Sequence, residues 1–431
     1  MPLPLQSLIG IAFLILAAWL CSANRRAIHW RPVLMGLLLH SMACLLFSRV
    51  APARAVLDTC GVAFVKLLSF SAEGSRFLFG ELSDPGGKLA FIFAFNVLPI
   101  LVFFAGLASL AYHFGILQRV VWVFAWVMRR TMRLTGTESL AVAGAVFLGQ
   151  SEAPLLVRPF IPDMTRSELF CMMTGGLSCL AGSVLGAYVS FLGGSDPAQQ
   201  SHFATWLILA SIMNAPAAVV FAKLLMPESE MPTLPPNLLT IEKGKHGHFI
   251  NALVMGAIDG MKLAAVIGSV LLVCVSLIAL LNYLTQNWIG DWLGVNQAIA
   301  AHTGGVFPGL TLQYLFGQMF RPFAWLMGVP WAETLQVGSL LGQKIVVNEF
   351  VAYLDLARMK NAHMLSPHAI MISTFALSSF SNFSSVGVCV ACMGALAPNQ
   401  RPILAKIGMR ALFCAVLAGL LTGSVSAMWL S

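Results

Sequence analysis

Apolar runs long enough to cross a lipid bilayer recur along almost the whole chain. A helix needs roughly 20 apolar residues to cross the ~30 Å hydrocarbon core. Runs of this kind lie at residues 4–23, 33–51, 89–113, 168–194, 203–225, 252–283, 368–395 and 405–430. The mean hydropathy is +0.84 and only 10% of the residues are charged, which excludes an ordinary soluble globule. We therefore predict an all-α polytopic membrane protein with about eight transmembrane helices.

Basic residues are distributed unequally between the segments that join these runs. If the first helix starts outside, the inner segments hold Arg25, Arg26, Arg31, Arg119, Arg129, Arg130, Arg133, Arg158, Arg166, Lys243, Lys245 and Arg401, and the outer ones hold fewer, including Arg54, Lys66, Arg76, Arg358 and Lys360. Because cytoplasmic loops carry the excess of Lys and Arg, both termini are predicted outside. This bias accounts for the net charge of +8, so no nucleic-acid partner is expected.

Two further apolar segments, residues 137–160 and 329–354, do not read as simple spans. Both contain Gly or Pro together with charged residues, namely Glu138, Glu152, Arg158, Glu333, Lys344 and Glu349. Irregular backbone at membrane depth is tolerated only where it is buried in protein or lines a wet cavity. We therefore predict two re-entrant helical hairpins.

A short internal echo supports a repeated architecture. The order Phe-Ala-Trp, then Glu, then Gly-Gln occurs at Phe124, Glu138 and Gly149, and again at Phe323, Glu333 and Gly342. Broken apolar segments at matching positions of two halves are typical of transporters built from inverted repeats. The predicted units are N-terminal scaffold helices with an external interfacial segment (1–114), a first repeat (115–225), a cytoplasmic linker (226–249), a scaffold helix with an interfacial segment (250–303) and a second repeat (304–431). Residues 115–133 form either an interfacial helix or a helix packed on its neighbours.

Glu152 and Glu349 are the carboxylates whose position is hardest to explain structurally. A carboxylate at mid-bilayer costs about 2.5–3.5 kcal/mol, so it normally faces a cavity, a partner or a substrate. The structural alternative is an ion pair of Glu152 with Arg158 and of Glu349 with Lys344. The nine cysteines and nine histidines show no metal-ligand spacing, and we expect neither a metal site nor a cofactor. Motifs typical of an intramembrane enzyme, such as HExxH or GxSxG, are missing from the sequence.

Five sequence blocks together resemble the concentrative nucleoside transporters. They are GQSEAPLLVRPF from Gly149, MTRSELFCMMTGG from Met164, LAGSVLGAY from Leu180, GQKIVVNEFVAY from Gly342 and FSNFSSVGV from Phe380. The resemblance implies a secondary active symporter that imports nucleosides such as uridine or adenosine across the inner membrane of a bacterium. It also implies a homotrimer in the lipid bilayer, in which an inner transport domain moves against a scaffold. A passive nucleoside channel is the alternative to a symporter.

The resemblance also assigns the substrate site. Residues matched to contacts with the base are Gln150, Ser151, Glu152, Val184 and Phe380, and those matched to the ribose are Asn348, Glu349, Asn382 and Ser385. A glutamine offers both a donor and an acceptor to a base edge, and a carboxylate can accept hydrogen bonds from two vicinal hydroxyls.

The chain departs from the sodium-coupled relatives where the coupling ion would bind. Two side-chain oxygen ligands of those relatives are replaced here by Ala145 and Cys179. Sodium prefers oxygen ligands, so this departure favours coupling to protons. Glu152 is the candidate proton carrier, because desolvation favours its neutral form while Arg158 favours its charged form. Sodium remains the alternative, held by a residual site at Ala145, Leu148, Cys179 and Leu180.

Overall fold

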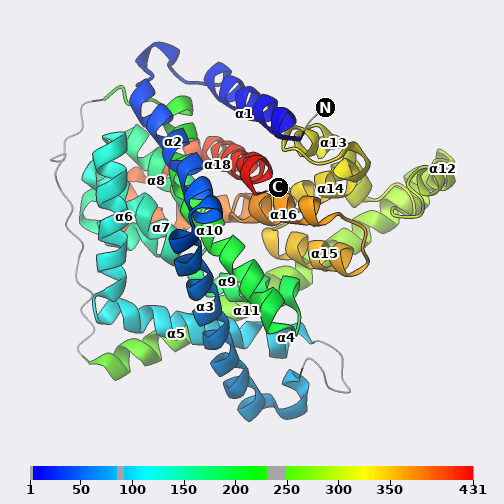
Figure 1. The fold of residues 1–431 in the computed structure, drawn as a ribbon, viewed down its shortest axis with the longest axis horizontal. Helices are drawn as coiled ribbons and strands as arrows, with labels where there is room; N and C mark the ends of the chain where they lie inside the picture. Colours follow the sequence, from blue (N-terminus) through cyan, green and yellow to red (C-terminus); the bar gives the residue numbers. More distant parts are fainter. Residues whose placement is uncertain (1–2, 85–91, 231–247, 431) are drawn as a thin grey trace.

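The computed structural model describes residues 3–84, 92–230 and 248–430 and consists of helices joined by short connections, with no strand in these ranges (Figure 1). The all-α prediction is confirmed for these residues. By length and composition, seven helices or helix pairs could cross a membrane: Trp30–Arg49, Ala51–Ser83, Phe93–His113, Arg166–Gly193, Pro197–Leu225, Phe249–Gly290 and Pro398–Trp429. The linker predicted at 226–249 falls mostly outside the described residues.

The same order of elements occurs twice. In the first half the order is α6 (Ile116–Met132), α7 (Gly136–Leu148) with the 3-10 helix η3 (Ala153–Asp163), α8 (Arg166–Ser178), α9 (Gly182–Gly193) and α10 (Pro197–Leu225). In the second half it is α13 (Leu312–Leu326), α14 (Thr334–Val346), α15 (Glu349–Asn361), α16 (Pro367–Leu377), α17 (Phe383–Leu396) and α18 (Arg401–Trp429). Helices α10 and α18 pack on each other and are mostly buried, so the two halves share one core.

Each half contains a helical hairpin close to a predicted one. The first pairs α7 with η3 over Gly136–Asp163, whose second arm is a 3-10 helix because it contains Pro159 and Pro162. The second pairs α14 with α15 and so begins and ends later than the predicted 329–354. Thr135 forms a capping box with Glu138 at the start of α7, and Asn348 caps α15.

The two runs at 168–194 and 368–395 were counted as spans, but neither is one continuous helix, in agreement with the broken helices that the resemblance implies. The first is broken between α8 and α9 at residues 179–181, and the second between α16 and α17 at residues 378–382. The second break is supported by Asn214 of α10, whose amide donates to the Ser378 carbonyl and, at 3.1 Å, to the Ser378 hydroxyl. Thr422 of α18 donates to the Asn214 carbonyl oxygen at 2.6 Å. The unwound backbone is therefore buried and hydrogen-bonded, as membrane depth requires.

The N-terminal unit, in which an external interfacial segment was predicted without bounds, contains a long helix that the apolar runs did not indicate. Residues 51–79 form a 29-residue helix, α3, which follows α2 (Trp30–Arg49) after a single extended residue. A Cβ at Gly36 of α2 would lie 2.5 Å from Val220, and one at Gly61 of α3 would lie 2.5 Å from Thr205. Both contacts are on α10, so α2 and α3 lie end to end along one helix, and the second half of α3 extends beyond it (Figure 1).

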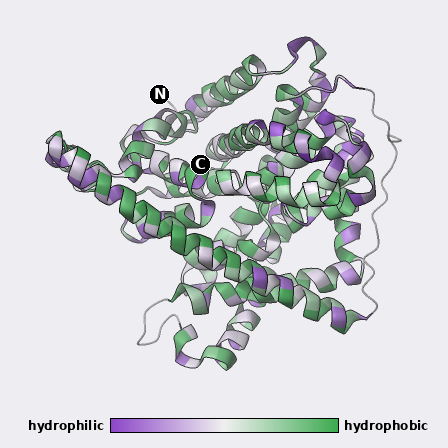
Figure 2. Ribbon diagram, turned by 180° about the vertical axis from the view of Figure 1, so that it is seen from behind, coloured by the Kyte–Doolittle hydropathy of each residue, from purple (hydrophilic) through white to green (hydrophobic). Residues whose placement is uncertain are grey.

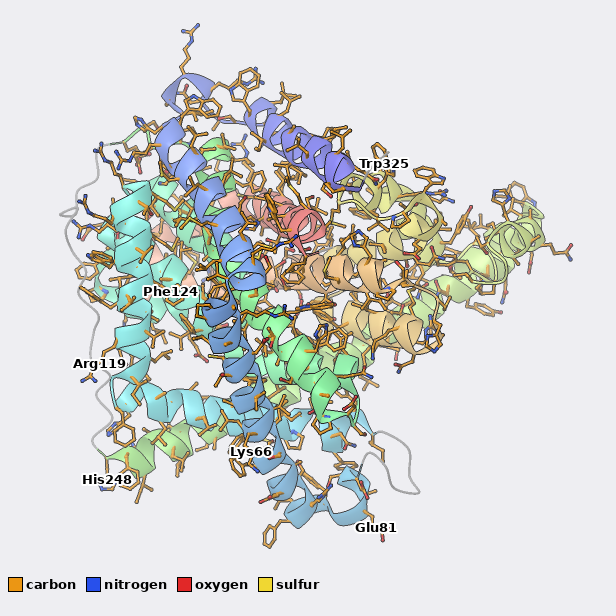
Figure 3. All side chains as sticks on the ribbon, viewed as in Figure 1. Lys66, Glu81, Arg119, Phe124, His248 and Trp325 are labelled. Atoms are coloured by element: carbon orange, nitrogen blue, oxygen red, sulfur yellow. The ribbon has the colours of Figure 1, made fainter. Side chains whose placement is uncertain are left out.

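The remaining helices surround this core. Helix α5 (Leu98–His113) packs along α11 (Phe249–Tyr283), which has the most apolar segment among the candidate spans and crosses one face of the molecule with most of its side chains exposed (Figure 2). Helix α1 (Leu3–Leu20) lies against α18 and reaches α13, where Gln6 donates to the carbonyls of Val329, at 3.2 Å, and Trp325 (Figure 3).

A buried ion pair fastens the base of the first hairpin. The Lys223 ammonium near the end of α10 donates to the Glu138 carboxylate of α7 and, at 3.1 Å, to the Ser167 hydroxyl of α8. All three residues are buried. One cation therefore joins three helices of the first half, an arrangement that the sequence analysis did not predict.

Candidate functional site

The tip of the first hairpin lies against the break between α8 and α9. Gly149 ends α7 with φ of 81°, and a Cβ there would lie 2.6 Å from the Cβ of Ala181. A side chain at this position would be strained by its backbone conformation and would also collide with the neighbouring break. Glycine thus allows the tip and the break to touch.

The three polar residues of this tip differ in their surroundings. The side-chain amide oxygen of Gln150 accepts from the Cys389 thiol of α17 at 3.5 Å, so the first hairpin contacts the second half of the chain. Ser151 and Glu152 are exposed. Within the described residues Glu152 forms no ion pair with Arg158, so the predicted alternative of an ion pair is not observed for Glu152.

The tip of the second hairpin presents a buried carboxylate. Asn348 uses its side-chain oxygen to accept the Val351 N–H at 3.0 Å, which starts α15. Glu349 is the first residue of that helix, and its side chain is only 3% exposed. A carboxylate in the first turn of a helix is favoured by the helix dipole, and its remaining acceptor positions require donors.

Those donors come from two helices distant in sequence. The Tyr188 hydroxyl of α9 donates to one Glu349 oxygen at 3.0 Å, and the Asn382 amide at the start of α17 donates to the other at 2.8 Å. The Tyr188 ring stacks on Tyr353 of α15 with centroids 4.4 Å apart, which fixes its direction. Glu349 therefore joins the second hairpin to both broken helices.

Asn382 also organises the break after α16. Its side-chain oxygen accepts from the Ser385 N–H at 2.8 Å and from the Ser384 hydroxyl at 2.7 Å. The amide thus caps α17 with its oxygen while its nitrogen reaches Glu349. Ser384 is exposed and Ser385 is buried.

Lys344 lies close to this carboxylate but binds elsewhere. Its ammonium is buried and donates to the Ala376 carbonyl at 2.7 Å and to the Ser379 hydroxyl at 2.6 Å. Both acceptors are at the carboxyl end of α16, where the helix dipole favours a cation. The expected alternative of an ion pair with Glu349 is therefore replaced by an ammonium that caps a half-helix.

The residues expected to hold a sodium ion lie at the corresponding place of the first half. Ala145 and Leu148 are in the last turn of α7, Cys179 and Leu180 are in the break after α8, and all four are buried. The side chains of these four residues provide no oxygen, so these residues could bind a hard cation only through their backbone carbonyls. Val184 and Phe380, the expected apolar contacts, are buried beside the two breaks.

Two residues of the site were missed by the sequence analysis. Tyr188 appeared only as part of an apolar block, and Lys344 was considered only as a partner of Glu349. The residue types alone could have indicated them, because a tyrosine hydroxyl or an ammonium inside an apolar run needs a buried hydrogen-bond partner. The sequence does not indicate which partner that is.

The chain matches three protein-family descriptions that cover most of its length. Residues 9–82 match the N-terminus and residues 206–427 the C-terminus of a family described as Na+ dependent nucleoside transporter. Residues 94–195 match a family described as nucleoside recognition, or Gate.

Individual relatives and solved structures agree with these matches. An uncharacterized transporter of Haemophilus influenzae is 36% identical over 99% of this chain and 98% of its own length. The human sodium/nucleoside cotransporter 1 is 36% identical over 96% of this chain, which spans 62% of the human protein. Among solved structures, CNTnw in an inward-facing substrate-bound state has a TM-score of 0.88 at 34% identity, covering 99% of this chain and 98% of its own. A variant of CNTnw in an intermediate state has a TM-score of 0.90 at 35% identity, covering 100% and 99%.

Proposed function

Because this chain belongs to the concentrative nucleoside transporter family, we propose that it carries nucleosides such as uridine or adenosine into the cell together with a cation. The observation that carries the proposal is the buried Glu349 carboxylate, held by Tyr188 and Asn382 where the second hairpin meets both broken helices. The family consists of nucleoside transporters and is not a family of enzymes.

We propose that Glu349 accepts the two vicinal hydroxyls of the ribose, with Asn348, Asn382 and Ser385 completing the sugar site. A carboxylate can accept more hydrogen bonds than its two protein donors supply. Such charge-assisted bonds contribute roughly 1.5–3 kcal/mol each, so the sugar would account for a large part of the affinity.

The base would lie toward the first hairpin. In this arrangement Gln150 offers a donor and an acceptor to the base edge, and the exposed Ser151 and Glu152 complete the polar side. Val184 and Phe380, beside the two breaks, would form the apolar floor under the ring. The site would thereby recognise both the apolar face of the base and the polar sugar of a nucleoside.

The transport cycle we propose is of the elevator type. The two hairpins enter the membrane without crossing it, and the core of α7–α10 and α14–α18 moves against the outer helices. CNTnw has been solved in outward-facing, intermediate and inward-facing states, which supports alternating access in this fold. We further propose a homotrimer in the inner membrane of a bacterium with both termini outside.

For the coupling ion we propose the proton, with sodium as the alternative. Supporting protons, the side chains of Ala145 and Cys179 bring no oxygen to the candidate ion site, and Glu152 places a titratable carboxyl at the tip of the first hairpin. Supporting sodium, the matching family is described as Na+ dependent and its mammalian members are named sodium/nucleoside cotransporters. The carbonyls of Leu148, Cys179 and Leu180 would then be the ligands.

Labelled nucleoside uptake into proteoliposomes tests both parts. Uridine and adenosine would be supplied under an inward proton gradient, an inward sodium gradient, both or neither. We expect accumulation above the external concentration with the proton gradient alone. Accumulation with the sodium gradient alone would show that sodium, and not the proton, is the coupled ion. Equilibration without accumulation would indicate a channel. The absence of flux for every nucleoside would contradict the proposed function.

A further inference from the structure

A cavity of about 1090 Å³ separates helix α3 from the hairpin helix α15. We propose that it binds an anionic phospholipid, with the phosphate at Lys66, Arg76 and Arg358 and an acyl chain along α3. The cavity is distinct from the nucleoside site, because none of the residues assigned to that site lines it.

The position of the cavity is at one end of the helix bundle. Its walls are α3 from Val62 onward, the end of α4 (Phe93–Asn96), the start of α5, the end of α9, the start of α10 and the end of α15. Several of these helices are long and apolar enough to cross a membrane, so their ends on this side mark the level at which they leave the hydrocarbon core. Phospholipid headgroups lie at this level. Figure 3 labels Lys66 on α3, and the cavity that Lys66 lines also includes Ile100 of α5 and Phe191 of α9.

The charge of the cavity is of one sign. Lys66, Arg76 and Arg358 line it, and none of its lining residues among those described is an Asp or Glu. Arg358 lies 3.4 Å from Asp355, but the arginine side chain is 72% exposed, so this pair neutralises it only weakly. The Lys66 ammonium lies 5.1 Å from the ring of Phe70. An anion entering here would meet three cations on two facing helices.

The surroundings of the cations are apolar. Leu68, Ile100 and Leu354 line the cavity wall. Farther along α3, Phe77 and Leu78 are 89% and 70% exposed. A soluble phosphate or nucleotide would use the cations and leave this surface uncovered. A phospholipid uses both, because its phosphate and its acyl chain are joined in one molecule.

A lipid here would connect the two parts that the proposed function sets in relative motion. Lys66 and Arg76 belong to α3 of the outer helices, whereas Arg358 belongs to the second hairpin. A phosphate bound by all three must lose at least one cation when the hairpin moves. This consequence rests on the proposed function, whereas binding itself does not. We expect anionic lipid to slow nucleoside uptake without changing which nucleosides the protein binds.

Lipid binding to the purified full-length protein is the test. Native mass spectrometry would count bound phosphatidylglycerol and phosphatidylethanolamine of identical acyl chains. The test variant is K66Q/R76Q/R358Q, and the matched control is R54Q/R119Q/K262Q, which removes three exposed cations outside the cavity. We expect phosphatidylglycerol affinity to fall at least about tenfold in the test variant alone, because each basic residue near the surface contributes to attracting anionic lipid.

A second variant fills the cavity without changing charge. Leu354→Trp is expected to lower phosphatidylglycerol binding in the same way, which separates loss of a site from loss of general attraction. Equal binding by the test and control variants, or displacement of the lipid by inorganic phosphate or uridine monophosphate, would overturn the proposal. Because binding is measured without a gradient or a nucleoside, failure of uptake would leave this result unaffected.

Discussion

At the scale of single residues, Glu349 is expected to decide sugar recognition. Glu349→Gln keeps the shape but removes the charge that strengthens hydrogen bonds from hydroxyls. Since such bonds contribute roughly 1.5–3 kcal/mol, uridine affinity should fall by about 10- to 100-fold. The affinity for 2′,3′-dideoxyuridine should change little. Isothermal titration with both ligands measures this difference.

The control for this prediction lies on the same helix. Asp355→Asn removes a carboxylate of α15 whose partner is Arg358, and we expect uridine affinity to stay within about twofold. Equal losses for uridine and its dideoxy analogue in Glu349→Gln would show that the variant damages the fold of the tip instead of the sugar contact.

Glu152 is expected to connect transport to pH. If its carboxyl carries the coupled proton, uptake by the unmodified protein should fall as the external pH rises, because fewer molecules bind the proton. Glu152→Gln is neutral at every pH, so its slower uptake should be independent of pH between about 5 and 8. Uptake at a series of external pH values, with exposed Glu73→Gln as the control, measures the dependence. An unchanged pH profile would remove Glu152 from this role.

The sequence named candidate polar residues for the site but not the residues that hydrogen-bond to them. Glu349 and Asn382 were expected from a motif, and the structure places them 2.8 Å apart. Tyr188 was not expected, because it lies 161 residues before Glu349 and its apolar neighbours resemble any buried helix. Contacts across such a separation depend on how the two halves pack, which a motif does not describe.

At the scale of elements, the Lys223 ion pair should stabilise the first hairpin. Lys223→Met leaves Glu138 buried without its cation, which costs about 3–5 kcal/mol in comparable cases. We expect a clear fall in the thermal unfolding midpoint in detergent. The double variant Lys223→Met with Glu138→Gln should recover much of it, and Lys262→Met, which breaks an exposed pair on α11, should have little effect. A double variant no more stable than Lys223→Met would contradict the pairing.

The contact of α3 with α10 gives a second test at this scale. A Cβ on Gly61 would lie 2.5 Å from the Thr205 hydroxyl and 3.0 Å from the Ser201 carbonyl, whereas Gly74 of the same helix has open space. Gly61→Val should therefore lower the unfolding midpoint, because overpacking typically costs about 1–3 kcal/mol. Gly74→Val has the same change of propensity without the collision. Equal midpoints for the two variants would mean that α3 does not pack on α10 at this point.

Helix breakers and charges predicted the elements only in part. Pro and Gly near Glu152 and Glu349 indicated hairpins, and hairpins are present. Helix α3 was missed because Arg54, Asp58, Lys66, Glu73 and Arg76 interrupt its apolar run, although the structure places them on an exposed side. The breaks within 168–194 and 368–395 were expected only from the resemblance, which implies a broken helix after each hairpin. Hydropathy counted both runs as single spans, because an averaged hydropathy cannot distinguish a helix from an unwound apolar segment.

At the scale of the whole molecule, the distribution of burial separates an inner from an outer part. Helices α10 and α18 are mostly buried, whereas the 35-residue α11 exposes apolar side chains along most of its length. An exposed apolar helix in a membrane protein contacts lipid or another copy of the chain. The sequence predicted both kinds of helix as equivalent spans, because hydropathy does not report which neighbour a side chain meets.

The proposed trimer gives a prediction at this scale. Light scattering in mild detergent should give a protein mass of three times the 46.3 kDa of one chain. Leu272→Lys on α11 should reduce the trimer fraction if this helix forms the contact, whereas Phe77→Lys on α3 should not. A mass of one chain at every concentration would contradict the trimer.

The ammonium of Lys344 at the end of α16 has a consequence for how the two halves divide their work. In the second half the cation is the Lys344 ammonium, which is covalently part of the chain and cannot be released. The corresponding end of α8, at Cys179 and Leu180, carries no such tethered charge. A symporter needs a coupled ion that binds on one side of the membrane and is released on the other. In the proposed cycle the coupled cation would therefore bind in the first half, where the end of α8 has no side-chain charge, whereas the Lys344 ammonium keeps the end of α16 permanently capped.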